Sequence, residues 1–92
     1  MSIRYEISDQ VISREVGEEA VILDLESGTY FGLATTGARI WQLIGQGKTL
    51  QEICDLVAGE YEVSRAELLH DLIALAQDLT ARGVIRARPS NA

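Results

Sequence analysis

The sequence predicts a small α+β domain in which a three-stranded antiparallel sheet is followed by three helices. Alternating apolar residues, separated by short turns that contain glycine, occupy the first third of the chain. The remainder carries apolar residues at helical spacing and two capping-box patterns. At 92 residues the chain is expected to form one domain, with a core over 11–85 and a flexible tail over 86–92.

Three strands are expected over residues 11–16, 19–25 and 29–33. Gly17-Glu18 and Ser27-Gly28 supply the turns between them, because glycine tolerates the positive φ that tight hairpins need. The first ten residues are mixed and polar, but Ile3, Tyr5 and Ile7 alternate. This alternation leaves an additional short strand open near the N-terminus.

The first helix is expected to begin at Thr35 or Thr36, with threonine as its N-cap, and to end at Gly45. Thr49-Leu50-Gln51-Glu52 and Ser64-Arg65-Ala66-Glu67 match the capping box that opens a helix. They predict a second helix that ends or weakens at Gly59, and a third that is closed by Gly83. Residues of the third helix form a leucine stripe, which consists of Leu68, Leu72, Leu75 and Leu79.

Composition argues against several classes of function. The net charge is −6, and no dense basic cluster is present that would neutralise nucleic-acid phosphates. Cys54 is the only cysteine, so neither an internal disulfide nor a cysteine-based metal site can form. The chain lacks a signal-peptide core and the run of about 18–20 apolar residues of a membrane span. We expect a cytoplasmic protein that binds neither nucleic acid nor membrane.

The side chains that could take part in catalysis or ligand binding do not combine into an active site. Gly47-Lys48-Thr49 resembles the end of a phosphate loop, but Gln42 replaces the required glycine and the preceding element reads as a helix. His70 lies opposite the leucine stripe and is expected in solvent, whereas Cys54 and Trp41 are expected in the core. We therefore predict no catalytic residue, no metal and no cofactor.

The last strand, residues 29–33, contains no lysine, proline or inward charge, which are the features that protect exposed sheet edges. Such an edge is either covered by another part of the fold or open to a partner peptide, and the sequence leaves both readings available. An open edge also favours self-pairing, so a homodimer is an alternative. Helices two and three could form a DNA-binding helix-turn-helix, although Glu67, Asp71 and Asp78 would repel phosphate.

Two joined segments carry a resemblance to a known family. The patterns LDLESGTYFGL over 23–33 and GARIW over 37–41, continued by RGVI over 82–85, resemble the PqqD family across residues 11–85. One departure is Ala34, where many relatives carry asparagine as a helix cap. The resemblance implies a winged-helix-like recognition element for the precursors of ribosomally synthesised, modified peptides.

The resemblance also implies a mode of action. Such elements are not catalytic; they bind the leader segment of a precursor as an added antiparallel strand and present it to a modifying enzyme. That enzyme is expected to be the leader peptidase and cyclase of lasso-peptide biosynthesis, with a radical S-adenosylmethionine enzyme as the alternative. Carried over residue by residue, the peptide-binding positions are Thr29, Tyr30, Phe31, Gly32, Leu33, Leu68, Asp71, Leu72 and Leu75.

Overall fold

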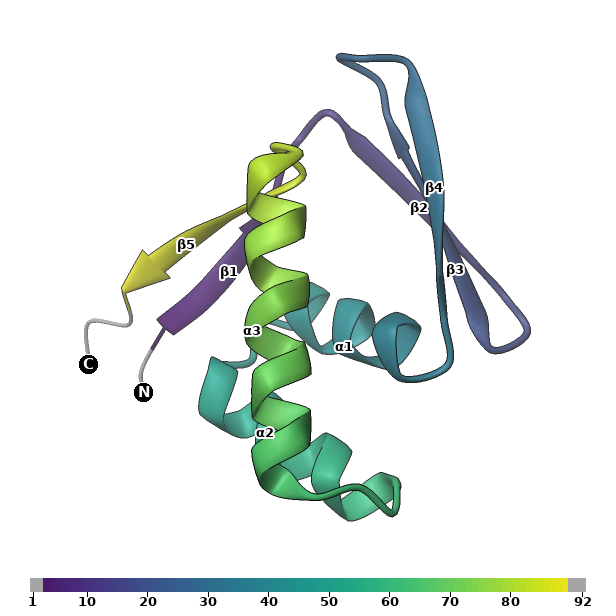
Figure 1. Cartoon of the computed structure of the whole chain (residues 1–92). Helices are drawn as coiled ribbons and strands as arrows, with labels where there is room; N and C mark the ends of the chain where they lie inside the picture. Colours follow the sequence, from purple (N-terminus) through teal and green to yellow (C-terminus); the bar gives the residue numbers. More distant parts are fainter. Residues whose placement is uncertain (1–2, 90–92) are drawn as a thin grey trace.

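The computed structural model describes residues 3–89. Its elements, in chain order, are β1 (Ile3–Ile7), β2 (Val11–Val16), β3 (Glu19–Asp24), β4 (Thr29–Ala34), α1 (Thr36–Gly45), α2 (Leu50–Glu60), α3 (Arg65–Ala81) and β5 (Ile85–Pro89). Figure 1 shows the sheet of β2, β3 and β4 on one side of the helices and the pair of β1 and β5 on the other. The expected α+β class is confirmed, with one additional small sheet.

The three expected strands form one antiparallel sheet in the order β2-β3-β4. The turn between β3 and β4 depends on Asp24, whose carboxylate accepts hydrogen bonds from the N–H of Glu26 and the hydroxyl of Ser27. Gly28 completes this turn with a φ of 73°, a conformation that favours glycine. The predicted Ser27-Gly28 turn is therefore confirmed.

The prediction of a flexible tail over 86–92 is wrong where the structure describes it. Residues 85–89 form β5, which pairs antiparallel with β1, so the additional N-terminal strand also exists. Glu6 of β1 accepts hydrogen bonds from Arg86 (2.9 Å) and Arg88 (2.6 Å). The sequence does not indicate this pairing, because β1 and β5 lie at opposite ends of the chain. Residues 90–92 of the expected tail lie outside the described residues.

The helices begin close to the expected positions, but not every predicted N-cap is present. Thr49 and Glu52 form the complete predicted capping box of α2, and the Ser64 side chain accepts from the Glu67 N–H at α3. The prediction that a threonine side chain caps α1 is wrong: Thr35 occupies the N-cap position without a capping hydrogen bond, at a φ of 50°. Gly59 does not end α2, which continues to Glu60.

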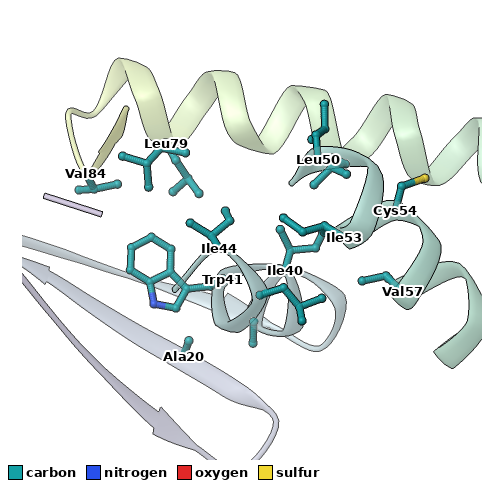
Figure 2. Packing of buried hydrophobic residues seen from close by; sticks show 14 of the residues in the cluster. Ala20, Ile40, Trp41, Ile44, Leu50, Ile53, Cys54, Val57, Leu79 and Val84 are labelled. Carbon is teal, nitrogen blue, oxygen red and sulfur yellow. The ribbon is translucent and has the colours of Figure 1, made fainter. Parts of the chain in front are cut away.

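Trp41 of α1 lies in the centre of the core, as expected, and is 3% exposed. In Figure 2 it lies between Ala20 of β3 and Val84, which follows α3. Cys54 is also buried, as a free thiol. The core therefore joins the inner face of the sheet to all three helices, which holds β4 in a definite position relative to α3.

Candidate functional site

β4 is an edge strand of its sheet, and no other strand among residues 3–89 pairs with its outer side. The hydrogen-bond ladder between β3 and β4 determines which backbone groups of β4 face outward. The Thr35 N–H donates to the Glu18 carbonyl (2.9 Å), in the register that aligns Glu19 with Ala34. Bonded and non-bonded pairs alternate in antiparallel ladders. The N–H and C=O groups that face the open edge therefore belong to Tyr30, Gly32 and Ala34.

The side chains of β4 divide between the two faces of the sheet. Phe31 and Leu33 are half-buried and align with the buried Ile22 and Ala20 on the inner face. Tyr30 lies on the outer face and is 75% exposed. Thr29 and Gly32 are also exposed. A methyl group added at Gly32 would meet nothing closer than the Ala20 carbonyl at 3.8 Å, so the outer side of this residue is open.

A hollow of about 310 Å³ lies where the start of α1 faces the first half of α3. Its lining consists of Thr36, Gly37, Ile40, Val63, Glu67, Leu68, Asp71 and Leu75. The hollow adjoins β4 through Gly37, because a methyl group placed there would lie 3.6 Å from the Cβ of Leu33. Gly37 therefore lies against the side chain of Leu33, where the end of β4 meets the hollow.

The four predicted positions on α3 occupy different environments. Leu68, Asp71 and Leu75 line the hollow, with Asp71 exposed and Leu75 half-buried. Leu72 is 1% exposed and belongs to the core. A change at Leu72 would therefore disturb the fold first, whereas Leu75 offers an apolar surface that a partner can contact.

Arg82 connects the far end of α3 to β4. Its guanidinium carbon lies 4.7 Å from the centroid of the Phe31 ring, which is cation–π geometry. The first half of α3 lies beside the start of α1, which directly follows the end of β4. α3 and β4 therefore run in opposite directions, as Figure 1 also shows.

Sequence reasoning missed several residues of this region. Ala34 offers outward backbone groups, and the lining of the hollow includes residues outside the predicted set, namely Thr36, Gly37, Ile40, Val63 and Glu67. The helical stripe that contains Gly37 and Ile40 was a usable signal for one wall. Nothing local in the sequence indicates that Arg82 lies over Phe31, since this contact joins residues about fifty positions apart.

Side chains in and near the hollow determine which ligands fit the region. Glu67 and Asp71 give the hollow an acidic margin, which disfavours nucleic-acid phosphate. His70 is exposed, as expected. Within residues 3–89, no group of three or more His, Cys, Asp or Glu side chains is arranged to hold a metal ion. No helix in the same range is long and apolar enough to cross a membrane.

Comparison with known proteins identifies the family. The family model described as "Coenzyme PQQ synthesis protein D (PqqD)" matches residues 19–85, which contain β3, β4 and all three helices. The chain belongs to the PqqD family. The resemblance that the strand–turn–strand–helix pattern carries is thereby confirmed. No curated protein sequence matches the chain significantly.

Two solved structures resemble this PqqD-family chain over nearly its whole length. One is described as TbiB1 in complex with the TbiA(beta) leader peptide; it is 40% identical, with a TM-score of 0.85 over 88% of this chain and 94% of that one. The other is lasso peptide synthetase B1 complexed with the leader peptide; it is 26% identical, with a TM-score of 0.82 over 90% and 98%. Both similar proteins were therefore seen with a leader peptide bound.

Proposed function

We propose that this protein binds the leader segment of a ribosomally synthesised precursor peptide as an added antiparallel strand on β4. The observation that carries the proposal is the open edge of β4 beside the hollow of α1 and α3. The two similar structures, each with a leader peptide, support the same ligand class. Of the nine peptide-binding positions expected from the sequence, all except the buried Leu72 belong to this proposal, with Ala34 added for its backbone.

The edge of β4 and the hollow would make different contributions to peptide binding. Main-chain hydrogen bonds to Tyr30, Gly32 and Ala34 are independent of peptide sequence and supply affinity. Apolar contacts with Leu75 and the neighbouring hollow would select particular side chains. Because a disordered leader loses conformational entropy on binding, we expect a Kd between about 10 nM and 10 µM.

In this proposal the protein is a delivery module and performs no chemistry of its own. The modifying enzyme that receives the peptide would be the leader peptidase and cyclase of a lasso-peptide pathway, which the description of the 26%-identical structure favours. A radical S-adenosylmethionine enzyme is the alternative partner. Turnover of a precursor peptide by this protein alone would contradict a purely binding role.

The direct test is a titration with the leader segment of the precursor encoded beside the gene, with the TbiA(beta) leader peptide as a second ligand. The informative variant is Gly32→Pro, because the Gly32 N–H points away from β3 and proline removes it without loss of a ladder bond. We expect at least a tenfold weaker Kd, which corresponds to about 1.4 kcal/mol for a lost backbone bond and the steric effect of the ring.

Ser13→Pro is the matched control. Ser13 lies on β2, the opposite edge of the same sheet, and its backbone also points away from β3 in the alternating ladder. This variant should fold like Gly32→Pro and bind the leader with unchanged affinity. Equal loss of binding in both variants, or none in either, would exclude strand addition on β4.

A further inference from the structure

We propose that Arg82 is a specificity-determining residue of the peptide site and that it binds a carboxylate in the C-terminal part of the added strand. This inference rests on the proposed function, since it assumes an antiparallel peptide on β4. It specifies the chemistry of that peptide: an acidic side chain is favoured near Arg82 and disfavoured at the opposite end. Three features of the structure support this difference between the two ends of the peptide site.

The first feature is the direction of α3 relative to β4. Arg82, after the end of α3, lies over Phe31 in the first half of β4, whereas Leu68 and Asp71 line the hollow beyond the end of β4. A peptide antiparallel to β4 therefore runs parallel to α3. Its N-terminal part passes the hollow, and its C-terminal part passes Arg82.

The second feature is the unused hydrogen-bonding capacity of Arg82. Its Nε donates to the Asp78 carboxylate at 3.2 Å, whereas Nη1 and Nη2 have no hydrogen-bond partner among residues 3–89. The Arg82 and Asp78 side chains are 50% and 57% exposed, so their pairing is weak and solvent-screened. The cation–π contact with the Phe31 ring, at 4.7 Å from the guanidinium carbon to the ring centroid, restricts the position of the guanidinium. The N–H groups of Nη1 and Nη2 match a carboxylate.

The third feature is the opposite charge at the other end of the site. Glu67 and Asp71 both line the hollow, and neither forms an ion pair with a cation among the described residues. An acidic peptide residue at this end would meet two carboxylates and be repelled. The site is therefore electrostatically directional, and a given acidic residue should help or harm binding according to its position.

The test is a substitution scan of the leader peptide that binds most tightly in the titration described above. Each position is replaced in turn by glutamate and by glutamine, and Kd is measured for the wild-type protein and for Arg82→Gln. We expect one C-terminal position at which glutamate binds about threefold to tenfold more tightly than glutamine. This preference should disappear in Arg82→Gln, whereas Arg82→Lys should retain part of it because the charge remains.

Arg88→Gln is the control, because it removes the same charge from β5, where Arg88 is paired with Glu6 on the other side of the molecule. It should leave the glutamate preference intact. A purely structural role of Arg82 would weaken all peptides equally and leave the Glu–Gln ratio unchanged, which would overturn the inference. An Arg82-dependent preference at an N-terminal position would overturn it too. If the unsubstituted leaders do not bind, the proposed function itself fails, and this inference fails with it.

Discussion

At the scale of single residues, the junction between β4 and α1 depends on an unusual conformation. Thr35 has a φ of 50° and a ψ of −108°, a region in which a β-branched residue is rare and strained. Its N–H donates to the Glu18 carbonyl, which continues the sheet register one residue beyond β4. Thr35 thus connects the two parts of the candidate site, which are the open edge of β4 and the hollow between α1 and α3.

Thr35→Gly should stabilise the protein. Relief of the strain is worth about 1–3 kcal/mol, and the greater flexibility of glycine in the unfolded chain offsets part of it, so we expect a net gain of about 1 kcal/mol. Urea denaturation measures the free energy of unfolding. Thr36→Gly, one residue into α1, is the comparison and should be destabilised by up to about 1 kcal/mol. A Thr35→Gly protein no more stable than wild type would show that the conformation is unstrained.

At the scale of elements, the two terminal strands are held together by charge as well as by backbone pairing. Hydrogen bonds from Arg86 and then Arg88 lower the pKa of the Glu6 carboxyl below its usual 4.5. A carboxyl whose pKa is lowered by folding stabilises the native state above its unfolded pKa. This contribution is lost as the pH falls through about 4.5 towards the lower, folded value.

Glu6→Gln should therefore reduce the pH dependence of stability. We expect the free energy of unfolding of wild type to fall between about pH 6 and pH 3, and the variant to show a smaller fall, since one titrating group is absent. Denaturation at several pH values provides the measurement. Glu62→Gln is the control, because Glu62 forms none of the ion pairs among residues 3–89. Identical pH profiles for Glu6→Gln and wild type would contradict a stabilising role for this ion pair.

At the scale of the whole molecule, the leucine stripe of α3 lies in two different environments. Leu79 is fully buried against the core, whereas Leu75, one turn earlier, is half-buried at the hollow. Stability and the proposed binding should therefore separate between two leucines of the same helix. Leu79 lies near Val84 in the core (Figure 2), whereas Leu75 lines the hollow.

Leu79→Ala should lower the free energy of unfolding by about 2–5 kcal/mol, because it leaves a cavity in a fully packed region, and the folded fraction should bind the leader normally. Leu75→Ala should cost less stability but weaken leader binding about tenfold through lost apolar contact. Denaturation and calorimetric titration of both variants give the two readouts. Normal leader binding by Leu75→Ala would remove the hollow from the proposed site.

The sequence alone was sufficient for the local elements and for the family. Glycine turns, the alternation of β3 and the capping box at Thr49 are encoded within a few residues, so the three strands of the main sheet and the three helices could be predicted. The open edge of β4 was one of two readings, since the absence of edge-protecting residues does not reveal what lies beside a strand.

Only the tertiary structure decided features that depend on distant parts of the chain. β5 exists because β1 and the Glu6 carboxylate lie beside it, although its own residues read as a tail. Leu72 lies in the core rather than at the hollow, because the packing of α3 buries this side chain among the other core residues. The contact of Arg82 with Phe31 likewise follows from the path of α3 past β4. Local propensity was sufficient for the main sheet and the helices, whereas long-range packing determines β5 and which faces of the elements remain available to a partner.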